Sequence, residues 1–369
     1  MNSIKKAICL FVFTGIAMNF LAAQDENASS FSLTQLIDNA LQKNYLLQAN
    51  KKNTLIKEAE IDRIKTQYQP SISTSASFSV WKFLMPNKER LLGGSITDFY
   101  NDIALQQTIY DWGLNKAERG LVEDEIRMND EIIRQLRHTI IYGVTDTYFE
   151  AIKAKAEIAV YQNALQQLES HLRYSQKLFD IGKVSSVDVL KTRVQISEEK
   201  KALQKSENHL DRELARLKRL CYIDDLVSIE VEDVPEDLYL ARNEQLFPAE
   251  ALYDKAIQDH PELKIVQHEL NIEGRQKELY RLENRPDLFA YGLASWEHGY
   301  VPFVDNFNYN IGVGIRYTLP IGKGSAYKSK ILQSELRTEK IHDEREQSLV
   351  DIKKDIDLAI NTINDIKVK

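Results

Sequence analysis

The residues that most often perform chemistry are present in this sequence, but their spacing matches no catalytic or metal-binding pattern. The seven histidines are scattered, and the sequence contains neither HExxH nor CxxC, the usual zinc and redox motifs. Cys9 lies in an apolar N-terminal run, and Cys221 has no organised base of the kind that a cysteine nucleophile needs. We therefore predict that the protein is not an enzyme and has no catalytic residues, no metal site and no cofactor.

One glycine-rich stretch, IGKGSA from Ile321 to Ala326, contains part of a phosphate-binding loop. In that loop a serine or threonine follows the lysine, and its hydroxyl binds Mg²⁺. Gly324 takes this place after Lys323, so the hydroxyl is missing. Because the stretch joins an alternating, strand-like segment to a helical one, we interpret its glycines as hinge residues.

The N-terminus has the layout of a secretory signal peptide. Two lysines precede an apolar run from Ala7 to Met18, and Ala22 and Ala23 then offer small residues for cleavage. A membrane anchor would need roughly 20 consecutive apolar residues, and Thr14 interrupts this run. We predict a signal peptide at 1–24 and export of the remaining chain.

Export leaves Cys221 as the one cysteine, so the core must be held by packing and not by an intramolecular disulfide. The leader removes two of the 48 basic residues and none of the 55 acidic ones, which makes the net charge −9. A chain with this charge has no electrostatic basis for binding nucleic acid.

The exported chain contains two internal repeats. LIDNALQKN (Leu36 to Asn44) and LYDKAIQDH (Leu252 to His260) share four identical positions, and the same spacing places Pro70 onto Pro286. An acidic connector separates the repeats, and its VSIEVE segment is consistent with a short strand. The predicted organisation is a first repeat at 25–221, the connector at 222–247 and a second repeat at 248–369.

After each of these prolines the apolar period becomes two, which predicts β-hairpins at 70–110 and 286–319. In SISTSASFSVW the odd positions are serine from Ser71 to Ser79, and the even positions form the apolar face. The last strand has the clearest alternation, and we predict that one face meets lipid through Phe307, Tyr309, Ile311, Val313, Ile315 and Tyr317. Strands of about 10 residues with one apolar face have the length of transmembrane β-strands.

A long helical hairpin is predicted at 114–220, with its turn in the sequence DIGKVSS. Gly182 can end the first helix in the left-handed conformation, Ser185 is placed to cap the second, and Asp188 takes the capping-box position. The second helix has apolar residues at every seventh position: Val189, Ile196, Leu203, Leu210 and Leu217. This repeat predicts an antiparallel coiled coil. The first helix of the hairpin, from Leu114 to about Asp180, would be roughly 100 Å long at 1.5 Å per residue.

The expected fold class is mostly α with transmembrane β. Four strands cannot close a barrel, and an open sheet edge is not tolerated in lipid, so several copies must share one barrel above periplasmic helices. A soluble sheet packed on a helix is the alternative. We favour the barrel because the helices are too hydrophilic to cover a sheet, and aromatic residues near the strand ends suit a membrane interface: Trp81, Tyr100, Tyr110, Trp296 and Tyr317.

The sequence resembles the TolC family of outer-membrane efflux proteins. The shared features are an early AL..N segment, a proline before each hairpin, QQTIYDWG after the second strand, YTLPIGKG after the fourth, and G..S..DVL at the helical turn. Their order and duplication across residues 31–369 carry the resemblance.

The resemblance implies a homotrimer in the bacterial outer membrane, with four strands per protomer in a shared barrel that continues into a helical tunnel. It also implies that a periplasmic adaptor protein connects this channel to an inner-membrane pump. The family's docking site, carried over to this sequence, comprises Asp180, Ile181, Gly182, Lys183, Val184 and Ser185. Of these, Ile181 and Val184 are apolar residues at an exposed turn, which indicates a partner.

The second repeat departs from the family pattern. Its long helix, predicted at 324–369, reaches the last residues with an uninterrupted apolar seam, and about 60 residues of the first repeat have no counterpart. Two alternatives therefore accompany the channel hypothesis. The chain could be a periplasmic coiled-coil scaffold with a small sheet, or a truncated fragment that does not conduct.

Overall fold

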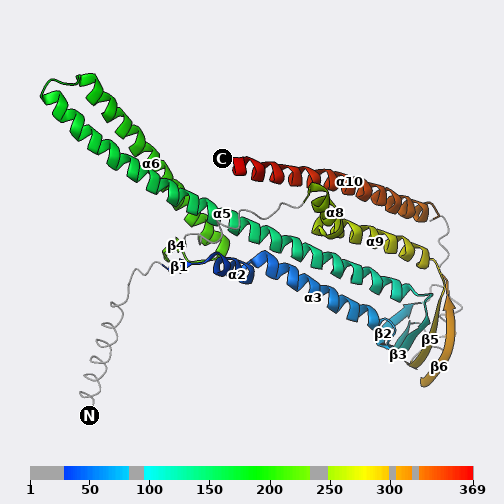
Figure 1. Ribbon diagram of the computed structural model, residues 1–369. Helices are drawn as coiled ribbons and strands as arrows, with labels where there is room; N and C mark the ends of the chain where they lie inside the picture. Colours follow the sequence, from blue (N-terminus) through cyan, green and yellow to red (C-terminus); the bar gives the residue numbers. More distant parts are fainter. Residues whose placement is uncertain (1–28, 83–94, 233–247, 299–304, 318–323, 369) are drawn as a thin grey trace, which may run out of the picture. The chain divides into compact units, whose positions relative to one another are not determined.

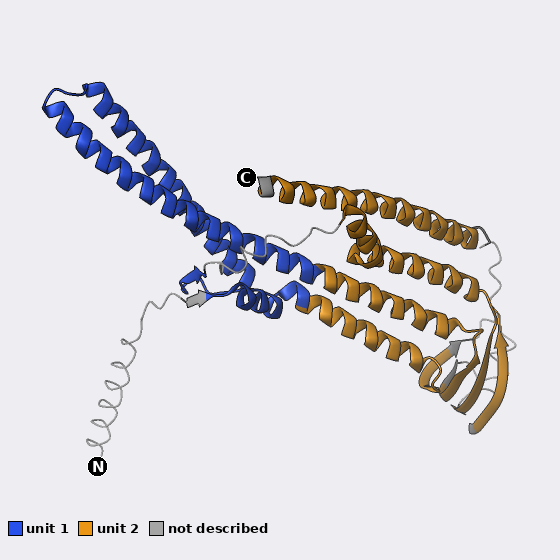
Figure 2. Cartoon of the chain, viewed as in Figure 1, with its two compact units in different colours: residues 1–47, 136–245 blue, residues 48–135, 246–369 orange. Residues whose placement is uncertain are grey.

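The computed structural model describes residues 29–82, 95–232, 248–298, 305–317 and 324–368, and this part of the chain is mostly helical with a few strands (Figure 1). The predicted signal peptide lies outside the described residues, as do the first three residues of the IGKGSA stretch. The chain divides into two compact units, each assembled from two separate stretches (Figure 2). Unit 1 comprises residues 1–47 and 136–245, and unit 2 comprises residues 48–135 and 246–369.

Unit 1 contains a helical hairpin and a small parallel sheet. Its elements are β1 (Ser29–Phe31), α2 (Leu33–Lys43), the second part of α5 (Leu114–Asp180), α6 (Ser186–Cys221) and β4 (Ile229–Val231). The core forms where these elements meet, and Leu36, Val144, Leu217 and Cys221 are almost fully buried there. The capping box of Ser32 and Gln35 begins α2 by satisfying backbone N–H groups that have no helical partner.

The α5/α6 hairpin packs along the apolar seam that the seven-residue spacing predicted (Figure 1). Val189, Ile196 and Leu217 on α6 are buried, and the intervening seam residues are partly buried. Polar contacts flank the seam, including a hydrogen bond of 3.3 Å from Ser206 Oγ to Glu157 Oε2. The seam therefore faces the partner helix, and the polar residues lie at its sides.

The sequence did not predict β1, which pairs in parallel with β4 in the connector. A strand of three residues is too short to show an alternating pattern of its own. Its pairing brings Phe31 beside Val231, although the whole helical hairpin lies between these two residues in the sequence. The connector segment that was consistent with a short strand thus has a partner near the N-terminus.

Unit 2 contains the larger sheet and the helices that adjoin it. Its helices are α3 (Tyr45–Thr66), the first part of α5, α8 (Ala249–Asp259), α9 (Pro261–Leu282) and α10 (Gly324–Val368). Its strands are β2 (Ser71–Lys82), β3 (Ser95–Tyr110), β5 (Asp287–His298) and β6 (Asp305–Arg316). Pro261 occupies the first turn of α9, where a missing N–H costs no helical hydrogen bond.

The sheet of unit 2 is antiparallel, with the strand order β2-β3-β5-β6. Each predicted hairpin forms one half, and β3 pairs with β5 to join the halves. The ladder between β3 and β5 is irregular between Thr108 and Tyr110. Within the described residues, β2 and β6 each pair on one side only, so the sheet has two free edges.

The last strand is described as far as Arg316. The alternating pattern predicted a strand through Tyr317 to Leu319, and β6 spans Asp305–Arg316. Arg316 lies opposite Asp287, the first residue of β5. Thr318 and Leu319 lie outside the described residues, so the predicted end of the hairpin stays a prediction.

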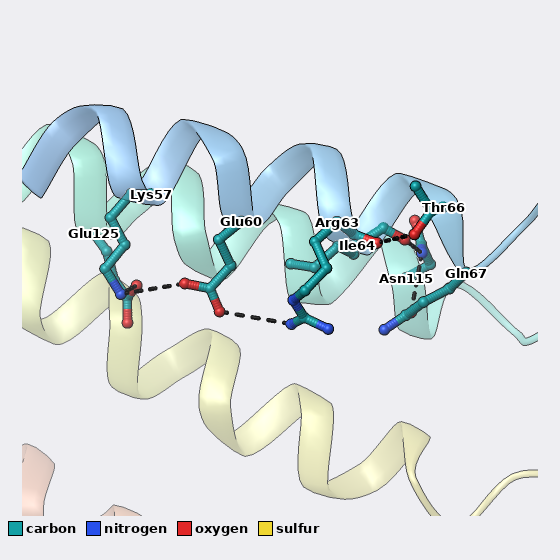
Figure 3. A network of polar contacts seen from close by, with 8 residues as sticks. All are labelled: Lys57, Glu60, Arg63, Ile64, Thr66, Gln67, Asn115 and Glu125. Atoms are coloured by element: carbon teal, nitrogen blue, oxygen red, sulfur yellow. Dashed lines mark hydrogen bonds and ion pairs between the residues drawn. The ribbon is translucent and has the colours of Figure 1, made fainter.

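Buried amide side chains connect α3 and α5 within unit 2. Asn129 donates from Nδ2 to the carbonyl oxygen of Asn50 at 2.9 Å and to Thr54 Oγ1 at 2.8 Å. Near the start of α5, Asn115 donates to the carbonyl oxygen of Ile64 at 2.6 Å (Figure 3). These directional bonds fix the axial register of the two helices as well as their separation.

Carboxylates provide the second set of contacts in unit 2. Asp124 on α5 is only 3% exposed in its side chain, and it pairs with Arg275 on α9 and with Arg127 at 2.7 Å. Lys57 on α3 pairs with Glu125 at 2.6 Å (Figure 3). Seven-residue patterns of apolar residues carry no information on such contacts, and the sequence did not predict them.

Candidate functional site

The turn between α5 and α6 closes with two backbone hydrogen bonds. Gly182 has φ of +72° and donates from its N–H to the Phe179 carbonyl oxygen at 2.9 Å. Lys183 donates to the Leu178 carbonyl oxygen at 2.9 Å. This pair of bonds is the Schellman arrangement, which satisfies the last carbonyl groups of a helix and favours glycine at the left-handed position.

Ser185 begins α6 in a reciprocal capping box with Asp188. The Ser185 hydroxyl accepts from the Asp188 N–H at 3.3 Å, and Asp188 Oδ2 accepts from the Ser185 N–H at 3.3 Å. The hydrogen bond from the Ser185 hydroxyl, at 2.9 Å, is the main cause that lowers the pKa of the Asp188 carboxyl. The turn is therefore rigidly closed at both ends.

Apolar side chains at this turn are open to solvent. Ile181 is 64% exposed, whereas Val184 is partly buried. Three further apolar residues on α6 lie outside the seven-residue seam and are exposed, namely Val187, Leu190 and Val194. These three residues are three and four positions apart, so they form a second apolar stripe on α6 beside the buried seam. The same spacing is visible in the sequence and is the signal that predicts this stripe.

The strand residues predicted to meet lipid are all exposed. Ile311 on β6 is 81% exposed, and its neighbours on the same face are Phe307, Tyr309, Val313 and Ile315. Tyr317 is exposed but follows the strand. The register places Gly292 and Leu105 on this face beside Ile311, so the apolar face continues across the sheet.

The opposite face of the sheet is polar on β2 and on much of β6, whereas β5 contributes Phe289, Tyr291 and Leu293 to it. The odd-numbered serines of β2 and the asparagines of β6 alternate with the apolar residues, and Asp102 accepts a hydrogen bond from the Ser75 hydroxyl. On β6, a Cβ added to Gly312 would lie 2.6 Å from the Tyr291 hydroxyl oxygen. A side chain at that position would therefore displace the Tyr291 ring, which covers the β6 backbone.

The connection from β3 to α5 is a tightly bonded turn in unit 2. The Asp111 carboxylate accepts from the N–H groups of Gly113 at 3.0 Å and Asn115 at 2.7 Å, and from the Tyr68 hydroxyl. Burial, followed by the Asp111 contact, raises the pKa of Tyr68 to about 12. Trp112 has φ of +60°, and the Arg285 guanidinium lies 5.5 Å from its ring centre. This turn sets the direction in which the helix leaves the sheet.

A family model described as outer membrane efflux protein matches residues 36–221, which is half of the chain. The matched stretch contains the first hairpin of the sheet, α5, the turn and α6. The chain belongs to the TolC family. Proteins of this family are outer-membrane efflux channels and not enzymes.

Solved TolC-family channels have the same protomer fold. A CusC structure matches with a TM-score of 0.74 and 16% identity, covering 90% of this chain and 76% of the other. CmeC of Campylobacter jejuni matches with a TM-score of 0.68 and 17% identity, covering 86% and 67% of the two chains. VceC of Vibrio cholerae matches with a TM-score of 0.70 and 15% identity, covering 86% and 75%. No curated protein sequence matches the chain.

The histidine, cysteine and acidic side chains of this TolC-family chain do not gather into a metal-binding cluster within its described residues. No group of three or more histidine, cysteine or acidic side chains there could hold a metal ion. Cys221 is buried, and burial raises the pKa of its thiol to about 11, so it carries little thiolate. The described helices also include none with the length and apolar content that a membrane crossing requires.

Proposed function

We propose that this protein is the outer-membrane channel of a tripartite efflux system or of a type I secretion system. Substrates cross it passively, from the periplasm or a pump to the exterior. Three copies each contribute four strands to one barrel of twelve, and the long helices continue as a tunnel in the periplasm. The apolar face of the sheet contacts outer-membrane lipid.

One observation carries this proposal: a four-stranded sheet with an exposed apolar face and two free edges, in a chain of the TolC family. Free edges present unpaired N–H and C=O groups, which are costly in lipid. Pairing of β6 in one copy with β2 in the next removes every edge once the ring closes. The same pairing keeps the serine and asparagine face toward the lumen.

A pair of lysine substitutions on adjacent residues of β6 tests the lipid-facing assignment. Ile311→Lys places a charge on the proposed lipid face, at a cost of about 2–4 kcal/mol near the membrane centre. We expect this variant to lose most of its outer-membrane trimer. Asn310→Lys, the matched control, places the same charge on the opposite face of the strand and should assemble normally.

Mass measurement in detergent and conductance in planar bilayers complete this test. A trimer with stable single-channel currents is the expected result. A water-soluble monomer in the periplasmic fraction would contradict the proposal and favour the coiled-coil scaffold. Equal assembly of the Ile311→Lys and Asn310→Lys proteins would contradict the lipid-facing assignment.

We further propose that the α5/α6 turn docks a periplasmic adaptor protein, which connects the channel to an inner-membrane pump. The docking residues are Asp180, Ile181, Gly182, Lys183, Val184 and Ser185. The exposure of Ile181 supports this assignment because apolar groups at a rigid, solvated turn favour burial in an interface. Val187, Leu190 and Val194 extend the same surface along α6.

The docking proposal is tested with two substitutions by aspartate, one in the turn and one on α5. Ile181→Asp should abolish copurification of the adaptor and substrate efflux, while the trimer and its conductance remain. Val160→Asp introduces the same charge at another apolar residue that is 64% exposed, away from the turn, and should leave efflux unchanged. Equal efflux by the two variants would exclude the turn as the docking site.

A further inference from the structure

Four helices of unit 2 line a groove that the proposed function does not use. Residues of α3, α5, α9 and α10 surround a space of about 550 Å³. This volume lies within the range of about 300–1,000 Å³ that is typical of small-molecule sites. Its apolar lining comes from Met128 and Ile132 on α5, Ile272 on α9 and Ile341 on α10.

Seven charged side chains also line the groove, and six of them form ion pairs. Lys57 pairs with Glu125 at 2.6 Å and Arg337 pairs with Glu273 at 3.7 Å. Lys340 pairs with Glu344 at 3.1 Å. These three pairs neutralise one another, so they contribute no net charge to the groove.

The seventh charged group is Glu269, on α9. Within the described part of the chain, its carboxylate has no hydrogen bond or ion pair, and its side chain is partly buried. Burial raises the pKa of Glu269, and the nearby Glu344 charge raises it further, against a smaller opposing effect of Lys340. A carboxylate in this setting lacks the counter-charge that its burial calls for.

We propose that this groove binds a small organic cation with an apolar body. The positive charge lies against Glu269, and the apolar body lies against Met128, Ile132, Ile272 and Ile341. An anion would be repelled by the net negative charge of the lining. A purely apolar molecule would displace water from the Glu269 carboxylate and offer it no hydrogen bond or charge in return. The inference concerns unit 2 alone and does not require the protein to conduct.

Two probes of the same shape and opposite charge test the ligand class. Tetraphenylphosphonium and tetraphenylborate are measured by equilibrium dialysis against the purified full chain in lipid nanodiscs, with empty nanodiscs as background. We expect saturable binding of tetraphenylphosphonium only. Equal binding of tetraphenylborate would overturn the proposal, because it would leave the carboxylate without a role.

Variants of two glutamates on α9 locate the site. Glu269→Gln should weaken tetraphenylphosphonium binding about tenfold, the loss expected for one charged contact in a partly buried place. Glu278→Gln removes an exposed carboxylate from the same helix, outside the groove lining, and should have no effect. Unchanged binding by Glu269→Gln, or equal weakening by both variants, would overturn the proposal.

Filling the groove gives an independent check. Ile272→Trp places a larger side chain in the lining and should reduce tetraphenylphosphonium binding while the helical circular dichroism is retained. Retained binding in a folded Ile272→Trp protein would overturn the site. Conductance is recorded on the same preparations without the probe. Absence of conductance then contradicts the channel proposal, and absence of tetraphenylphosphonium binding contradicts the groove proposal, as two separate results.

Discussion

In the α5/α6 hairpin of unit 1, the two helices pack against each other through a seam of apolar side chains. In unit 2, α5 also has buried apolar residues such as Val122, but its contacts with α3 and α9 include buried amides and carboxylates, above all Asn129 and Asp124. Apolar contacts depend on area and tolerate small shifts along the helix axis. Hydrogen bonds are directional, so the buried amides and carboxylates select one register. The same helix α5 therefore takes part in both kinds of packing along its length.

The two regions are therefore sensitive to different kinds of substitution. Loss of an apolar group from the seam leaves a cavity, whose cost follows the volume removed. Loss of one partner from a buried polar pair leaves the other without a counter-charge. Four substitutions test this comparison, taken here from the largest expected effect to the smallest.

The largest effect is expected in the apolar seam. Leu217 is fully buried, so Leu217→Ala should lower the free energy of unfolding by about 3 kcal/mol. Leu190→Ala on the same helix removes an exposed side chain and should cost less than about 0.5 kcal/mol. Guanidinium-induced loss of helical circular dichroism measures both. Equal midpoints would show that the seam does not stabilise unit 1.

A smaller effect is expected from the polar contacts of unit 2. Asp124→Asn removes the charge that faces Arg275 and Arg127, and should cost about 1–2 kcal/mol. This is below the cost for a fully buried pair because the two arginine side chains are 37% and 56% exposed. Asp130→Asn changes an exposed residue of α5 and serves as the control. If the two variants unfold alike, the polar contacts do not determine the stability of unit 2.

The capping box should contribute less again. Ser185→Ala should destabilise the first turn of α6 by about 1 kcal/mol, measured by amide hydrogen exchange. It should also raise the pKa of Asp188 toward its ordinary value, measured by NMR titration, since the Ser185 hydrogen bonds lower that pKa. The contribution of Asp188 is present above the ordinary carboxyl pKa and is lost as the pH falls through the lowered one. An Asp188 pKa unaffected by Ser185→Ala would contradict this account.

The smallest effect has the opposite sign. Glu269 has a raised pKa in the folded chain, so its charge destabilises the fold above that pKa, and the penalty disappears below the ordinary carboxyl pKa. Glu269→Gln should therefore unfold at a slightly higher denaturant concentration at neutral pH, with the difference shrinking toward pH 4. Glu278→Gln, at an exposed site, should show no such pH-dependent gain. A destabilised Glu269→Gln protein would indicate a favourable internal partner for Glu269.

The predictable parts of the fold were those with a local signal. Proline at Pro70 and Pro286 marked the change from helical to alternating periods, and strands β2 and β5 begin directly after them. Gly182 and Ser185 marked the turn because their backbone conformations are rare elsewhere in a helix. The exposed stripe at Val187, Leu190 and Val194 was not predicted, because the seven-residue pattern identifies only the seam that faces the partner helix.

The polar contacts could not be predicted in this way. Asp124 and Arg275 are 151 residues apart, and neither is distinguished by its neighbours in sequence. Many acidic and basic residues of the same helices remain exposed, so the choice of these two depends on how α5 and α9 lie in unit 2. The three-residue strand β1 is a further case, because its partner β4 lies beyond the whole helical hairpin.

The sequence by itself determined the periods, the turns and the family, because each of these is recorded in residues close together along the chain. The tertiary structure decided that β3 joins β5 and that Asp124 meets Arg275. It also placed Glu269 in a groove lined by four helices, where it has no hydrogen bond or ion pair within the described residues. The physical reason is that burial and pairing are properties of the assembled helices and strands. They arise only when residues far apart in the sequence come within a few ångströms of one another.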